Sequence, residues 1–97
     1  MIDVITATVE QFARFQDQDF EVITDEGPIT LKLIEVSKLG SGEREGGAFS
    51  VLWQGPETPF VDQQTHRLKH PEAGELALFL VPVGQQDAGF QYEAVFT

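Results

Sequence analysis

The sequence of 97 residues contains no cysteine. Disulfide bonds and thiolate metal sites are therefore excluded, and the composition is compatible with a reducing compartment. The chain also lacks any apolar run near the ~18 residues that a membrane-spanning helix needs. Because no charged-then-apolar leader opens the sequence, we expect no signal peptide, no membrane partner, and a place in the cytoplasm or in an assembled particle.

Basic residues are scarce, since six Lys and Arg stand against sixteen Asp and Glu, for a formal charge of −10. Proteins that bind nucleic acids neutralise phosphates with clustered lysine and arginine side chains. A strongly negative chain with few, scattered bases repels phosphates, so we expect no nucleic-acid partner. The same charge is compatible with a basic protein partner.

The chain does contain many apolar and aromatic residues, at 41% and 10% of the sequence. These fractions are typical of a folded globular protein and differ from those of disordered chains. The length fits a single domain over residues 1–97 with one core. Eight Phe, against one Met and one Trp, predict a core built on rigid rings.

Hydrophobic periodicity predicts one short helix followed by strands. Thr8 and Gln11 occupy the two positions of a capping box, so we expect a helix over residues 8–15. A change of the apolar face near Leu33 indicates a bulge or a twist. Strands are expected over residues 20–24, 29–37, 49–53, 65–70, 76–83 and 90–97. The pattern predicts an all-β fold with one short N-terminal helix: a small six-stranded, mostly antiparallel meander forming a sandwich or partly open barrel.

The last two predicted strands differ in their patterns. Residues Leu76 to Val83 are apolar on both alternating faces, which predicts a strand covered on both sides at the centre of the fold. The final strand is polar on one face, at Gln91, Glu93 and Thr97. If this strand lies at a sheet edge, its backbone can pair with another chain, so these three residues are the candidate protein-contact edge.

The single Trp and the single Tyr allow two interpretations. The default is that Trp53 and Tyr92 belong to the core, because both follow the alternation of apolar residues in their strands. The alternative is that they are exposed and form an aromatic platform for a small molecule or carbohydrate.

Two histidines and a cluster of acids could suggest metal sites, but each has a simpler explanation. His66 and His70 lie about 13 Å apart if they are on a strand, which is too far for one ion, so we expect surface or rim histidines. The acidic cluster Asp17, Asp19 and Glu21 lacks the glycine and the closing glutamate of a calcium loop. We therefore expect solvated acids and no metal.

No segment carries a catalytic or cofactor motif. The glycine-rich residues 40–47 contain Glu43 and Glu45 and are followed by a predicted strand, so they are expected to form a hairpin loop and no phosphate site. None of the serines lies in a nucleophile motif. A carboxylate-based hydrolase would need two acids that converge in a cleft. We expect no enzyme and no cofactor.

Four segments resemble a family of small uncharacterised bacterial β-domain proteins with the pattern PFSLLFRGP, TYRLEH, LFLVPIG and YEAVF. The matching segments are Phe49–Pro56, Thr65–His70, Leu78–Gly84 and Tyr92–Phe96. Ala48, Trp53 and His66 stand where proline, phenylalanine and tyrosine are usual in that family. The resemblance implies a compact β domain that works by contact, is encoded near phage-tail-like proteins including tail-collar types, and has no catalytic residues to carry over.

The sequence thus predicts a non-enzymatic protein-binding or structural module, working with a protein partner or as a homo-oligomer. A phage-tail-like or other multi-subunit bacterial assembly is the expected setting. A small-molecule or carbohydrate-binding module is the alternative.

Overall fold

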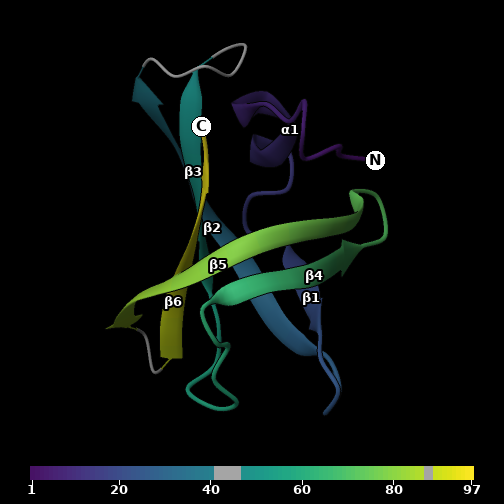
Figure 1. The fold of residues 1–97 in the computed structure, drawn as a ribbon, viewed down its shortest axis with the longest axis vertical. Helices are drawn as coiled ribbons and strands as arrows, with labels where there is room; N and C mark the ends of the chain where they lie inside the picture. Colours follow the sequence, from purple (N-terminus) through teal and green to yellow (C-terminus); the bar gives the residue numbers. More distant parts are fainter. Residues whose placement is uncertain (41–46, 87–88) are drawn as a thin grey trace.

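The structure is a computed structural model that describes residues 1–40, 47–86 and 89–97. One short helix precedes six strands, and together they form the fold shown in Figure 1. The elements are α1 (Val9–Ala13), β1 (Asp19–Ile23), β2 (Ile29–Gly40), β3 (Ala48–Gln54), β4 (Gln64–His70), β5 (Gly74–Gln86) and β6 (Gly89–Phe96). The predicted all-β fold with six strands and one N-terminal helix is confirmed.

All strand pairs are antiparallel and belong to one sheet, in the order β1-β2-β3-β6-β5-β4, with β4 pairing back to β1. One sheet selects the barrel-like alternative over a sandwich. The predicted meander is only partly right, because β4 pairs with β1 and β5 and does not pair with β3. The loop from β3 to β4 therefore crosses one end of the ring.

The ring is not a clean barrel, because its two longest strands change partners along their length. The first part of β5 pairs with β4 as far as Leu80, and the rest pairs with β6 from Val81 onward. In the same way, β2 pairs with β1 up to Lys32, and beyond Lys32 it pairs only with β3. This sharing lets two long strands bend around one small core.

The helix begins as the sequence predicts and covers one end of the ring (Figure 1). Thr8 Oγ1 accepts a hydrogen bond from the Gln11 backbone N–H at 3.3 Å, and Gln11 Oε1 accepts one from the Thr8 N–H at 3.1 Å, so the capping box is confirmed. The helix ends at Ala13, earlier than expected. Its buried Phe12 packs on Phe96, with ring centroids 5.2 Å apart.

The change of face predicted near Leu33 is also confirmed. The pairing of β2 with β3 shifts register between Leu33 and Glu35, which is the signature of a bulge. A second shift lies between Lys38 and Gly40. Most of the hairpin loop predicted over residues 40–47 lies outside the described residues. The undescribed part is residues 41–46, which include Glu43 and Glu45.

The core is built on aromatic rings, as the eight phenylalanines predict. Phe20 meets Trp53 edge to face at 4.9 Å, and Phe49 stacks on Phe96 at 4.6 Å. Aromatic pairs in such geometries add about 0.5–1.5 kcal/mol beyond the burial of their area. The largest side chains with almost no exposed surface are Trp53, Tyr92, Phe12, Phe20, Phe49, Leu31, Leu33, Leu68 and Leu80.

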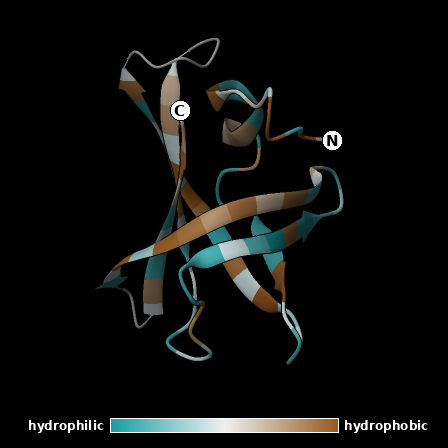
Figure 2. Cartoon of the chain, in the orientation of Figure 1, coloured by the Kyte–Doolittle hydropathy of each residue, from teal (hydrophilic) through white to brown (hydrophobic). Residues whose placement is uncertain are grey.

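The prediction that β5 is covered on both sides is wrong. Leu76, Leu78 and Leu80 point inward and are buried, but the alternate row points outward, where Phe79 is 52% exposed. Val83 is 50% exposed just beyond a register shift. The apolar colouring that runs along β5 in Figure 2 therefore marks the outer surface as well as the core. In a ring of one sheet, the outer face has no second layer to cover it.

The prediction that the last strand lies at a sheet edge is wrong as well. On one side β6 pairs with β3, from Gln91 to Phe96, and on the other with β5, from Gly89 to Glu93. Its backbone is occupied on both sides over residues 91–93, so strand addition along Gln91 and Glu93 is excluded. Thr97 lies just beyond the end of the strand.

Candidate functional site

The two residues of the predicted aromatic platform are both inside the ring. Trp53 and Tyr92 are cross-strand neighbours on β3 and β6, and each is 0% exposed. The platform is therefore contradicted, and the core interpretation of both residues is confirmed. The reason is the register, which turns these two positions inward together.

Tyr92 has a structural task in the core. Its hydroxyl oxygen accepts a hydrogen bond from the Val61 backbone N–H at 2.9 Å, which fixes the β3–β4 loop across the end of the ring. Burial raises the pKa of the Tyr92 phenol, the Val61 N–H opposes that shift, and the Asp62 charge adds to it. The direction of this shift is the one expected for a phenol held in an apolar interior.

The residues of the predicted contact edge lie in different settings. Gln91 Nε2 donates to Gln54 Oε1 at 3.1 Å, and Gln54 Nε2 donates to the Gln86 carbonyl at 2.9 Å, so Gln91 belongs to a chain of amides that ties three strands together. Glu93 projects from the outer face of β6, and Thr97 is exposed at the chain end.

The outer face around Glu93 is apolar. Antiparallel register places Leu52 of β3 on one side of Glu93 and Val81 of β5 on the other, all three half-buried. Two residues further along β6, Val95 is 51% exposed, and two residues back along β5, Phe79 is 52% exposed. We call Leu52, Phe79, Val81 and Val95, with Glu93 between them, the outer apolar face. It is the candidate functional site.

Sequence reasoning missed this surface although the signal was present. The sequence shows the apolar row of β5 at Phe79 and Val81, but the two apolar faces of this segment predict a covered interior. Val95 shares its face of β6 with the polar residues Gln91 and Glu93. A pattern of alternation shows that a face is apolar, but it does not show whether the same chain covers that face.

The two histidines have different roles, and neither matches a metal site. The Nε2 of His66 lies 2.7 Å from the Asp62 carbonyl oxygen on a half-buried surface. His70 is only 8% exposed, which corrects the expectation of a surface or rim residue. Its ring packs against Phe15 and Phe20, at centroid distances of 4.8 and 4.7 Å.

Hydrogen bonds define the tautomer of His70. Its Nδ1 accepts from the backbone N–H groups of Glu72 and Ala73, at 3.0 and 3.2 Å. The ring proton therefore sits on Nε2, which donates to Gln18 Oε1 at 2.8 Å. His70 thus holds the β4–β5 turn and connects it to the segment before β1.

We expect His70→Gln to destabilise the fold by about 1–2 kcal/mol more than His70→Asn, because it removes the acceptor that Nδ1 provides to the β4–β5 turn. An asparagine oxygen occupies nearly the position of Nδ1 and keeps an acceptor for the N–H groups of Glu72 and Ala73. A glutamine amide reproduces Nε2 instead and leaves these donors unpaired. Urea unfolding followed by Trp53 fluorescence measures both variants, and equal losses would show that the turn hydrogen bonds contribute little.

The acids predicted to be solvated are on the surface. Asp17 and Asp19 are exposed, and Glu21 is half-buried. Among the described residues, the ion pair is Arg67 with Glu75, whose Nη2 and Oε2 atoms lie 2.7 Å apart. The hydrogen bond and charge of Arg67 lower the pKa of the Glu75 carboxyl. Both groups are exposed, so this pair adds little to stability.

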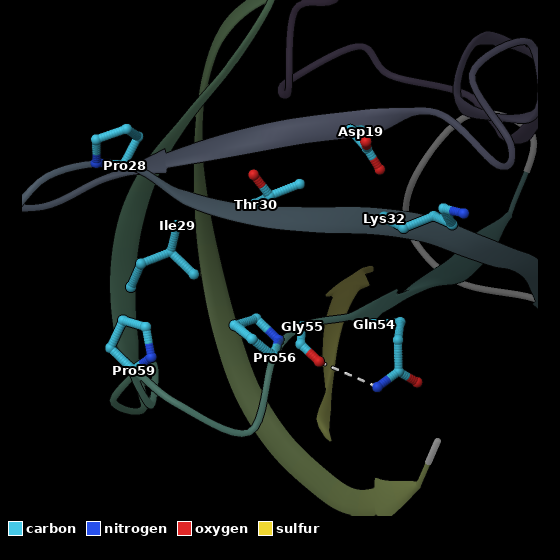
Figure 3. A pocket seen from close by; sticks show the side chains of 9 residues that line it. All are labelled: Asp19, Pro28, Ile29, Thr30, Lys32, Gln54, Gly55, Pro56 and Pro59. Atoms are coloured by element: carbon cyan, nitrogen blue, oxygen red, sulfur yellow. Dashed lines mark hydrogen bonds between the residues drawn. The ribbon is translucent and has the colours of Figure 1, made fainter. Parts of the chain in front are cut away.

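The β1–β2 turn lies at the end of the molecule opposite α1 (Figure 1). Two shallow hollows flank this turn. The first has a volume of about 520 Å³; Figure 3 shows Ile29 beside Pro59, with Asp19 and Lys32 further along the strands. The second, of about 530 Å³, lies between residues 23–29 and 59–67. The described residues that line the first hollow include the charged side chains of Asp19 and Lys32.

The described residues contain no group of three or more histidine, aspartate or glutamate side chains placed to hold a metal ion. Within the same residues, no helix has the length and apolar character needed to cross a membrane.

Comparison with known proteins gives a family and no established activity. No curated protein and no solved structure matches the chain significantly. A family model described as "Domain of unknown function (DUF6916)" matches residues 7–96, nearly the whole chain, which is consistent with the resemblance to a small uncharacterised family. The chain belongs to the DUF6916 family.

Proposed function

We propose that this protein is a non-enzymatic protein-binding module whose outer apolar face is covered by another subunit. The observation that carries the proposal is the exposure of Phe79 and Val95, each two residues along its strand from the half-buried cross-strand pair of Val81 and Glu93. Large contiguous apolar patches are rare on the surface of monomeric proteins and typically mark interaction sites. A strand with two apolar faces needs neighbouring structure against both faces. In β5 the described residues cover only the face that points into the core.

The net charge of the molecule favours a different protein over a second copy of this chain as the partner. The chain carries a formal charge of −10, so two copies repel each other. Within the described residues, the carboxylate of Glu93 forms no ion pair and stands between Val81 and Leu52. A second copy would bring a like charge to an apolar contact. The surface therefore favours a different protein that presents apolar side chains around a lysine or arginine.

We place this contact in a multi-subunit bacterial assembly of the phage-tail-like kind. Support comes from the resemblance of the segments Phe49–Pro56 and Leu78–Gly84 to proteins encoded near phage-tail-like proteins. A small subunit that binds by an apolar face and repels its own copies suits a structure built from unlike parts.

Photo-cross-linking in the cells that produce the protein tests the proposal. We place the photoreactive residue p-benzoylphenylalanine at Phe79 and, as a matched control, at Leu39 of β2. Both native side chains are 52% exposed, and in the ring β3 and β6 separate β2 from β5. The expected result is a discrete adduct from position 79 with one other protein, identified by mass spectrometry, and none from position 39.

A further inference from the structure

The second hollow, between residues 23–29 and 59–67, is a groove with both apolar and polar lining residues, and it is separate from the outer apolar face. Apolar side chains lie open in it: Phe60 is 46% exposed and Ile23 is 37% exposed, with Pro28 and Pro59 also at the surface. We call it the end groove. Its volume of about 530 Å³ accommodates a few side chains of an extended peptide.

One wall of the end groove is the β1–β2 turn, and its own hydrogen bonds hold it. The Gly27 backbone N–H donates to the Thr24 carbonyl at 3.1 Å, and the Thr24 hydroxyl donates to the Gly27 carbonyl at 2.6 Å. Gly27 adopts a φ of +115°, which a residue with a side chain would avoid. This wall is therefore formed before any partner arrives.

The opposite wall is the β3–β4 loop, which the core anchors. The phenol of Tyr92 accepts a hydrogen bond from the N–H of Val61, and the ring of Phe60 meets that of Phe90 edge to face at 5.0 Å. Phe60 is thus a fixed aromatic side chain with one side open to the groove. Binding to two preformed walls costs little conformational entropy.

The charges around the groove are mainly negative. Asp25, Glu26 and Asp62 line it, and in the described part of the chain none of these carboxylates forms an ion pair. The guanidinium of Arg67 also lines it but is engaged by Glu75. Exposed apolar side chains beside these carboxylates complement a segment that carries both apolar and cationic side chains.

We propose that the end groove docks an extended segment of a partner protein in which lysine or arginine alternates with apolar residues. The apolar side chains cover Phe60 and Ile23, and the cations meet Asp25, Glu26 and Asp62. The module then holds two neighbours, one on its outer apolar face and one at this end. This inference uses other residues than the proposed function and stands or falls separately.

The test is an NMR titration of the ¹⁵N-labelled chain with a capped hexapeptide of alternating arginine and leucine. We expect amide shift changes concentrated at residues 23–29 and 59–67, and none above background with a peptide of alternating glutamate and leucine. The triple variant Asp25→Asn, Glu26→Gln, Asp62→Asn is expected to weaken binding by about tenfold, at roughly twofold per exposed charge pair. Phe60→Ala is expected to weaken it by about fivefold.

A matched control has the same net charge as the triple variant and acids neutralised far from the groove: Glu10→Gln, Asp17→Asn and Glu72→Gln. These side chains are exposed and lie outside the lining of the groove. The control is expected to bind the arginine peptide within about twofold of the native chain. Equal loss in both triple variants, shift changes outside the groove, or no binding at millimolar peptide would overturn the proposal.

Discussion

Replacing Trp53 with alanine is expected to lower the free energy of unfolding by about 3–5 kcal/mol. The indole is 0% exposed and packs on Phe20 at the centre of the ring, so the substitution leaves a large cavity. The free energy of unfolding of a native domain is about 5–15 kcal/mol in total, so the variant would be close to unfolding. Urea unfolding followed by far-UV circular dichroism measures the change.

The matched control is Leu39→Ala, which removes an apolar side chain that is 52% exposed, with an expected change within about 0.5 kcal/mol. Trp53→Phe separates ring packing from hydrogen bonding. Among the described residues, Trp53 Nε1 is a buried polar atom without a hydrogen-bond partner, so phenylalanine removes an unpaired donor and costs only about 1 kcal/mol. A loss below about 1 kcal/mol in Trp53→Ala would contradict the central position of this residue.

Phe79→Asp is expected to abolish binding of the partner subunit while leaving the fold intact. A carboxylate buried in the contact is desolvated without a counter-ion and adds to the charge of Glu93, so we expect an affinity loss of at least about 100-fold. Because Phe79 faces solvent in the isolated chain, the stability should change by no more than about 0.5 kcal/mol. Calorimetry with the partner identified by cross-linking gives the affinity.

Leu39→Asp is the control for this variant, with the same chemistry at an equally exposed position on another strand. It should bind the partner within about twofold of the native chain. If both aspartate variants bind alike, the outer apolar face is not the contact. Thermal unfolding of all three proteins separates lost binding from lost structure.

Local features of the fold could be read from the sequence because they depend on near neighbours. The capping box of Thr8 and Gln11 and the bulge near Leu33 involve few residues, and both are confirmed. The inward positions of Trp53 and Tyr92 follow from alternation along their strands. Strand order depends on contacts between distant segments, so the closure of β4 onto β1 lay beyond sequence periodicity.

The candidate site could be predicted only in part, for a physical reason. Alternation identified the apolar row that contains Phe79, and a single sequence does not say whether another layer of the same chain covers such a row. The sequence suggests that Glu93 lies at a free edge, but the residue pairs with β3 on one side and with β5 on the other. Only its side chain is therefore available to contact another protein. The burial of His70 is not visible in the sequence because the ring contacts and the Gln18 hydrogen bond come from a segment about fifty residues away.

The mass of the adduct formed from position 79 shows whether another protein covers the outer apolar face. We expect a product of this chain joined to one different protein, with no comparable product from position 39. An adduct of two copies of this chain, or equal yields from both positions, would contradict it.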